Sequence, residues 1–482
     1  MESEVIETLL TPANKLPVSY VPTPSAPYRV HRKAAQATMQ PGRPCRNTNG
    51  LAAAAFPAGS RVLIWKQDPS VTELGTRKTF LPGVILEGPR DARIASGAPG
   101  ILPVSPNAFG DFIMQPNTDQ FDAVHTFAVV RQTLTMYQRA LASGGEAAPL
   151  PWQWNSASDT KPLQIFPHGL PDVMNAYYSR DERALKFGDF VPNGADERMY
   201  TCRSFDIVAH ETGHAVLDGL KPRWLLNNNP PQTGGLHESF GDLTAIFLTL
   251  SQLDQTEAVI AQTKADLHDK TFLADMAEQF GLALGRPNGL RNADNDLKLS
   301  EAGNEVHAIS QVFTGAVYDI LADMFAHERQ PGLLDDAAML HRVGEYLCGL
   351  VLRALMAAPD HAASYAHVVN QMLRIVAEDG KPAEYGNFIR NRFSMREVVT
   401  APAVQDQGQG QGQGQGLTGN GGPAAPAELA PDVEDQPGVP QDRRACCGTM
   451  NNAQYFELED ALDQERAELA RWCQGYAARN GG

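Results

Sequence analysis

IVAHETGHAVL, residues 207–217, is an apolar run interrupted by two histidines four positions apart, with a glutamate next to the first. On an α-helix, residues four apart lie on one face, so His210 and His214 can bind the same metal ion while Glu211 projects beside it. This pattern is typical of one half of a catalytic zinc site. The alternative is an ordinary amphipathic helix with two histidines near a surface.

A second motif, GGLHESFGD at residues 234–242, opens another apolar run that is typical of a buried helix. Catalytic zinc takes three protein ligands and leaves one position for water, and two histidines with a carboxylate are a known ligand set. Glu238 is therefore the candidate third ligand. Asp242, one helical turn later, is the candidate acceptor for the second ring N–H of a ligating histidine. Taken singly, either residue is more simply a solvated or capping carboxylate.

A third motif, NEVHAIS at residues 304–310, also precedes an apolar, helix-like run. Hydrolysis of an amide places negative charge on the former carbonyl oxygen, and a donor directed at that oxygen stabilises it. His307 is the candidate donor because it follows the two zinc motifs in the chain. A lone histidine before a helix is otherwise a packing or capping residue.

Together these segments resemble the thermolysin family of zinc metallopeptidases, the gluzincins, in which a glutamate is the third ligand. Two further segments resemble the family: Asn175-Ala176-Tyr177-Tyr178 is similar to its substrate-binding edge strand, and Leu290-Arg291 to the Leu-Arg pair whose guanidinium holds a substrate carbonyl. The likeness covers roughly residues 110–400, with the motifs in the family's order. It implies an α+β zincin fold with a β-rich N-terminal lobe, a helical C-terminal lobe and one zinc ion in the cleft between them.

The resemblance also implies a role for each matching residue. The metal ligands would be His210, His214 and Glu238, with Asp242 orienting a ligating imidazole. Glu211 would be the general base acting on a zinc-activated water, and His307 would stabilise the tetrahedral intermediate. Asn175, Ala176 and Arg291 would bind the substrate, although Asn175 fits a turn equally well and Arg291 a solvated loop. The expected activity is that of a metalloendopeptidase that prefers a hydrophobic residue after the cleaved bond.

The chain departs from the family pattern at several points. No tyrosine lies between Ala215 and His237 to assist His307, and the expected acidic partner of His307 is replaced by Ala302, which leaves Glu301 or Glu305 for that role. Asp206 is a single candidate ligand for calcium, an ion that takes about six to eight oxygens, so the sequence does not support a calcium site. These departures keep open an alternative function, a catalytically impaired zincin-fold binding or effector module.

Charge and composition restrict the partners and the compartment. The net charge of −16 disfavours binding to nucleic acid or to anionic membrane, since both are polyanions. No basic, apolar leader is visible at the start of the sequence, so the expected compartment is the cytoplasm, with signal-independent export as the alternative. The six cysteines form no CxxC pair and are expected to be free thiols. The expected partner is a peptide or protein substrate.

The sequence predicts five segments. Residues 1–55 are rich in proline and alanine and form a flexible start. A β-rich lobe follows at 56–220, with strands near 61–65, 84–86 and 111–114 and a helix over 121–141, and a helical lobe at 221–400 contains the helical runs 312–325, 337–357 and 364–377. Residues 401–443 form a Gln/Gly/Pro linker, and 444–482 a helical tail that docks on the catalytic domain, covers the cleft as an inhibitory segment, binds another protein or stays detached.

Overall fold

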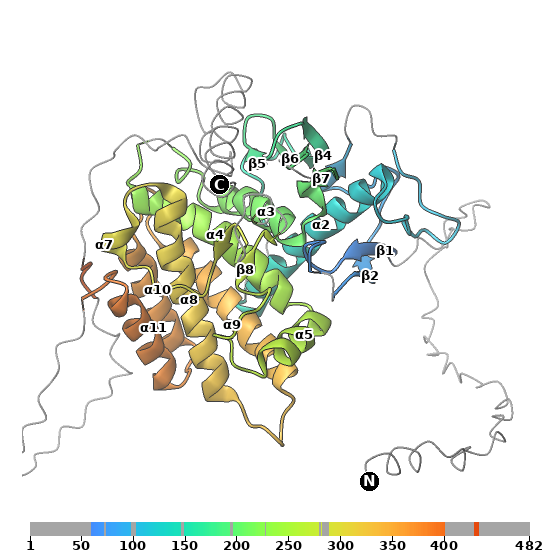
Figure 1. Cartoon of the computed structure of the whole chain (residues 1–482). Helices are drawn as coiled ribbons and strands as arrows, with labels where there is room; N and C mark the ends of the chain where they lie inside the picture. The colour runs from blue at the N-terminus through green and yellow to red at the C-terminus, as the bar shows by residue number, and fades with distance from the viewer. Residues whose placement is uncertain are drawn as a thin grey trace, which may run out of the picture. The chain divides into compact units, whose positions relative to one another are not determined.

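The computed structural model describes residues 59–71, 74–97, 103–145, 149–192, 196–226, 228–278, 281, 289–400 and 429–432. All of them belong to one of the two compact units of the chain, Phe56–Gly482. The predicted flexible start, most of the Gln/Gly/Pro linker and the helical tail lie outside the described residues. Within them the fold is mixed α+β, as the sequence predicts (Figure 1).

A mixed sheet forms the β part of the fold next to the site. Its strands are β3 (Ile94–Ser96), β4 (Leu163–Pro171), β5 (Ala176–Ser179), β6 (Ala184–Phe190) and β7 (Met199–Tyr200). The order is β3-β4-β6-β5, in which β3, β4 and β6 run parallel, while β5 pairs antiparallel with β6 at the edge. Among the described strands, the segment expected at the edge of the sheet is therefore there, although Asn175 lies just before β5.

The first strands of the chain form a separate hairpin. β1 (Gly59–Trp65) pairs antiparallel with β2 (Thr76–Pro82), so the strand near 61–65 is confirmed and β2 is an addition. The strand predicted at 84–86 is wrong: Leu86 makes one isolated bridge, and Gly83, with φ of +93°, turns the chain away after β2. The strand predicted at 111–114 is also reduced to one bridge, at Phe112. In these two segments Ile85 and Phe112 are buried, whereas Val84, Leu86 and Ile113 are exposed.

The helices contribute most of the core. They are α2 (Asp119–Ser143), α3 (Phe205–Leu220), α4 (Pro231–Leu250), α5 (Leu253–Thr263), α7 (Leu299–Ala302), α8 (Val306–Glu328), α9 (Asp336–Ala357), α10 (Tyr365–Glu378) and α11 (Ala383–Met395). The predicted helical runs correspond to α2, α8, α9 and α10. A short hairpin of β8 (Asp275–Met276) and β9 (Arg291–Asn292) lies outside the main sheet. In Figure 1, α3 and α4 lie between strands β4–β7 and helices α8–α11.

Helix α4 is buried along its whole length, including the polar side chains of His237, Glu238 and Asp242. It packs against α3 on one side and α8 on another. Two glycines allow the closest approach to α3: a Cβ on Gly213 would lie 3.2 Å from the Cα of Gly241, and a Cβ on Gly241 would lie 2.6 Å from the His210 ring. Any side chain at these positions would force the helices apart.

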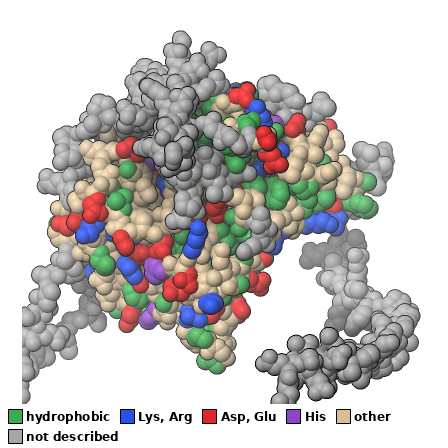
Figure 2. Space-filling view, viewed as in Figure 1, with side chains coloured by type: hydrophobic (Ala, Val, Ile, Leu, Met, Phe, Trp, Pro, Cys, Tyr) green, Lys and Arg blue, Asp and Glu red, His purple; other side chains and the backbone are tan. Residues whose placement is uncertain are grey.

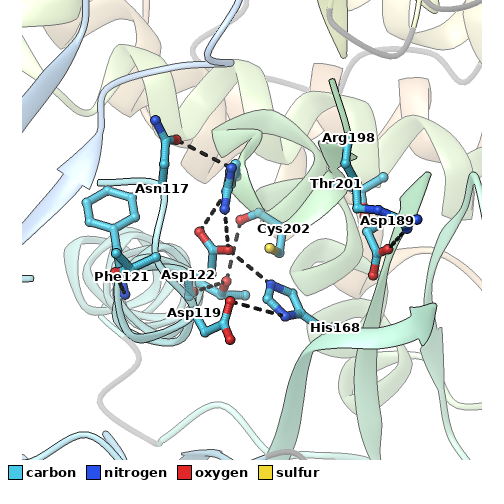
Figure 3. Close-up of polar contacts among 12 residues, drawn as sticks. Asn117, Asp119, Phe121, Asp122, His168, Asp189, Arg198, Thr201 and Cys202 are labelled. Carbon is cyan, nitrogen blue, oxygen red and sulfur yellow. Dashed lines mark hydrogen bonds and ion pairs between the residues drawn. The ribbon is translucent and has the colours of Figure 1, made fainter. Parts of the chain in front are cut away.

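A buried ion-pair network fixes the segment that leads into α3. Asp122 of α2 accepts hydrogen bonds from Nε and Nη2 of Arg203 at 2.8 and 2.9 Å, and its Oδ2 lies 3.0 Å from His168 Nε2 on β4 (Figure 3). Arg203 belongs to the 3-10 turn η2 (Thr201–Arg203), just before α3. Thr126 adds a hydrogen bond to the Cys202 carbonyl. The network thus joins α2, the sheet and the start of α3.

The described surface has no dominant charge on the face seen in Figure 2, where acidic and basic side chains are interspersed. Among the described residues, no helix combines the length and the apolar character needed to cross a membrane.

We predict that Asp122→Asn destabilises the protein by about 3–5 kcal/mol, because it leaves the Arg203 guanidinium buried without its counter-charge. Burial raises the pKa of Asp122, but the His168 and Arg203 hydrogen bonds outweigh it and hold that pKa below its ordinary value. The contribution is therefore present above the unfolded pKa and is lost as the pH falls through the folded one. Denaturant unfolding at several pH values measures both effects.

The matched control is Asp119→Asn, whose side chain is 63% exposed and lies 4.0 Å from His168. It is expected to change the stability by less than about 0.5 kcal/mol. Equal stability changes for the two variants would contradict the role given to the buried network.

Candidate metal site

Helices α3 and α4 bring the three predicted metal ligands together. His210 Nε2 lies 3.6 Å from Glu238 Oε2, and His214 Nε2 lies 3.6 Å from Glu238 Oε1. The two imidazole centroids are 4.6 Å apart with their planes at 89°. Two atoms bound to one tetrahedral zinc ion are separated by ~3.4 Å, given metal–ligand distances of about 2.0–2.2 Å. The donor set therefore fits a zinc ion in both its chemistry and its spacing.

The ionisation states also suit a metal. Burial lowers the pKa of His214 well below its ordinary value, so this imidazole is neutral and offers a lone pair. Burial alone would raise the pKa of Glu238, but the attraction of the neighbouring His307 and the hydrogen bonds from His210 and His307 hold it well below its ordinary value. A neutral imidazole and an ionised carboxylate are the forms that bind zinc.

Asp242 lies where the sequence predicts an orienting carboxylate. Its Oδ1 is 3.0 Å from His210 Nδ1. Burial would raise the pKa of Asp242, but the Arg291 guanidinium and His210 keep it below its ordinary value. An ionised acceptor at this position requires a proton on His210 Nδ1, which leaves Nε2 for the metal.

Arg291, expected to bind the substrate, is held by a carboxylate of the protein. Its Nη2 and Nε donate to Asp242 at 2.6 and 3.1 Å. The side chain is only 10% exposed, although it lines the pocket beside the site. Arg291 is therefore the counter-charge of Asp242. Only a small part of its side chain is exposed to the pocket.

His214 has an orienting neighbour that the sequence motifs do not predict. Its Nδ1 lies 2.8 Å from His237 Nδ1, and both side chains are fully buried. His237 immediately precedes the ligand Glu238 on α4, and burial lowers its pKa to about 3, so it is neutral. The only signal in the sequence is a histidine next to a candidate ligand, a pattern that also occurs in proteins that bind no metal.

His307 reaches the site from the start of α8. Its Nε2 lies 3.1 Å from Glu238 Oε2, and its Nδ1 lies 2.8 Å from Glu305 Oε1. Glu305 also caps α8 by accepting from the Ala308 N–H. Of the two acidic residues considered as partners of His307, Glu305 makes the contact, and it combines that role with the helix cap.

A pocket opens beside the imidazoles. Its lining residues come from four segments of the chain: Ala176, Thr201, Asp206, Ile207, His210, Glu211, Met276, Ala277, Leu290 and Arg291. Glu211 and the candidate ligand His210 thus both border an apolar cavity. Ala176 of the edge strand borders the same cavity. Asn175 is buried, and its Oδ1 accepts a hydrogen bond from the Ala176 N–H at 2.8 Å.

Three groups of described residues have ligand-type atoms within 4.8 Å of one another: His210 with Glu211 and His214, Asp122 with His168 and Cys202, and His268 with Asp294 and Asp319. In the second group, Asp122 is already paired with Arg203, and burial raises the pKa of the Cys202 thiol. In the third, Asp319 is paired with Arg396 at 2.9 Å. Only the first group offers a metal ion its donors without an arginine counter-charge on one of them.

Carboxylates also gather beneath the start of α3. Burial, together with the charge of Asp68, raises the pKa of Asp206 to about 6. Burial and the charges of Asp206 and Asp68 raise the pKa of Glu278 to about 11. Neither carboxylate oxygen of Glu278 has a hydrogen-bond partner in the described part of the chain. Asp206, the single calcium-ligand candidate of the sequence, therefore has two acidic neighbours.

We predict that Glu278→Gln stabilises the protein at about pH 8 by on the order of 1–3 kcal/mol, because Glu278 must take up a proton on folding beside Asp206 and Asp68, whereas Gln is already neutral. The raised folded pKa means that the protonated carboxyl stabilises the fold below the unfolded pKa. This contribution declines as the pH rises toward the folded value, so the two proteins should have similar stability near pH 4. Thermal unfolding in calcium-free buffer at both pH values tests this.

Thermal unfolding in millimolar calcium tests whether the three carboxylates bind a cation. Calcium that raises the midpoint of the wild type but not of Glu278→Gln would show that the three carboxylates share a cation. A variant less stable than the wild type in calcium-free buffer at about pH 8 would contradict the expected cost of protonating Glu278 on folding.

Comparison with models of known protein families finds no match to this chain, and comparison with curated proteins finds none either. The likeness to the thermolysin family therefore rests on the motifs and on the distances between their side chains.

Proposed function

We propose that this protein is a zinc-dependent metalloendopeptidase with the two-lobe, thermolysin-like form of the zincin fold. The observation that supports it best is the convergence of three side chains from two helices, with Glu238 3.6 Å from each imidazole. Glu211 lies beside this group and borders the adjoining pocket. A site built only for structural zinc would use four protein ligands and would need no such base.

Different residues of the site have different roles in hydrolysis. Zinc, when bound, polarises the scissile carbonyl and lowers the pKa of the attacking water toward neutrality. Glu211 accepts the proton of that water and passes it to the leaving amine. His307, oriented through Nδ1 by Glu305, directs Nε2 into the site and donates to the oxygen that becomes negatively charged.

The substrate lies along the edge of the sheet. Within the described residues β5 has a strand neighbour on one side only, so an extended peptide can pair with its other edge, and Ala176 brings β5 to the pocket. The pocket is bordered by Ile207, Leu290 and Met276, which favour an apolar side chain. This arrangement supports a preference for a hydrophobic residue after the cleaved bond.

We predict that Glu211→Gln lowers kcat/KM on a peptide substrate by about 10²–10⁴-fold, because the amide cannot accept the proton of water. Zinc content, measured by mass spectrometry of the purified protein, should stay at one ion per chain. The control is Glu257→Gln, an exposed position on α5, which should leave both quantities unchanged.

If the wild type binds one zinc ion per chain but shows no cleavage that depends on Glu211, the peptidase proposal is wrong. That result would favour the alternative, an impaired zincin-fold binding or effector module. Absence of zinc from the wild type would remove both.

A second prediction concerns specificity. When denatured proteins are digested with this protein and the new termini are sequenced by mass spectrometry, leucine, isoleucine, valine, phenylalanine and methionine should dominate the position after the cut. The Glu211→Gln variant provides the background to subtract. A majority of charged residues at that position would contradict the role given to the apolar pocket.

A further inference from the structure

The two zinc-binding imidazoles are oriented by chemically different neighbours. Behind His210 lies the carboxylate of Asp242, which only accepts hydrogen bonds. Behind His214 lies another imidazole, that of His237, which can either donate or accept at Nδ1. The N···N distance of 2.8 Å and the complete burial of both rings show a short hydrogen bond isolated from solvent.

One proton lies between these two nitrogens, and its position decides whether His214 can bind a metal. If His214 Nδ1 donates, its Nε2 carries a lone pair toward Glu238, and His237 keeps its own proton on Nε2. If His237 Nδ1 donates, the proton of His214 moves to Nε2, the atom 3.6 Å from Glu238 Oε1, and that nitrogen cannot bind zinc. The two arrangements contain the same number of protons.

We infer that His237 is a positioning residue that holds His214 in its Nδ1–H tautomer when zinc is bound, so that zinc affinity depends on an acceptor at the His237 Nδ1 position. The inference rests on the zinc site proposed above. His214 is thus oriented by an imidazole, whereas His210 is oriented by the carboxylate of Asp242. The His237 side chain then helps to determine how tightly zinc is bound.

The side chains that can replace His237 separate this role from simple packing. Asn carries its Oδ1 at the same distance from the backbone as histidine Nδ1, so it retains the acceptor. Gln places its amide one bond further out, and Leu fills the space without any acceptor. The inference therefore orders zinc affinity as wild type and Asn above Gln and Leu.

The experiment uses the full chain and measures the zinc dissociation constant by competition with a chromophoric chelator. Loss of an orienting partner typically weakens metal binding by about 10–100-fold, so His237→Gln and His237→Leu should show that loss, while His237→Asn stays within about threefold of the wild type. His361→Leu, an exposed histidine outside the site, is the control. Circular dichroism establishes that each variant is folded, and the Asn–Gln comparison remains informative if Leu is not tolerated.

Imidazole nitrogen-15 spectra of the zinc-loaded wild type show which ring nitrogen carries the proton. A purely structural role of His237 would not fix that position. His237 should show an unprotonated Nδ1 and a protonated Nε2, and a protonated Nδ1 on His237 would overturn the inference. Equal zinc affinity in the Asn, Gln and Leu variants would overturn it as well, even with an active wild type. A wild type that binds zinc but cleaves no peptide would instead count against the peptidase proposal alone.

Discussion

The candidate site depends on one contact, the close approach of α3 and α4 at Gly213 and Gly241. A side chain on either glycine would collide with the facing helix, and at Gly241 it would occupy the space of the His210 ring. Since the His pair belongs to α3 and Glu238 to α4, the distance between these helices sets the distance between imidazole and carboxylate. The packing of two buried helices is thus what turns separate motifs into one donor set.

Around that contact, each functional imidazole is held from behind by a different chemical group. Asp242, itself paired with Arg291, lies behind His210, while His237 lies behind His214 and Glu305 behind His307. Burial keeps His214 neutral, and the surrounding imidazoles keep Glu238 ionised. Orientation and ionisation state are therefore both settled before any ligand arrives, which reduces the cost of reorganisation when a metal or substrate binds.

The rest of the fold holds α3 in place. The Asp122–Arg203 pair ties the turn before α3 to α2, and β5, whose Ala176 borders the pocket, pairs with the buried strand β6. Near the same end of α3, Asp206 is crowded by Asp68 and Glu278, which raises the pKa values of Asp206 and Glu278. Near the start of α3, the charge of Asp122 is thus balanced by Arg203, whereas Asp206, Asp68 and Glu278 form a cluster with an excess of acidic groups.

The sequence by itself determined the local features: the long helices α2, α3, α4, α8, α9 and α10, whose apolar periodicity runs over many residues, and the candidate ligands, whose types and spacing follow from metal chemistry. It could not find β2, β4 or β6, or the loss of strands near 84–86 and 111–114, because short strands depend on partners far away in the chain. Only the tertiary structure decided that His237 orients His214, that Glu305 rather than Glu301 contacts His307, and that Arg291 pairs with Asp242. Each of these contacts joins residues through hydrogen bonds of about 3 Å, a precision that residue spacing in a sequence does not carry.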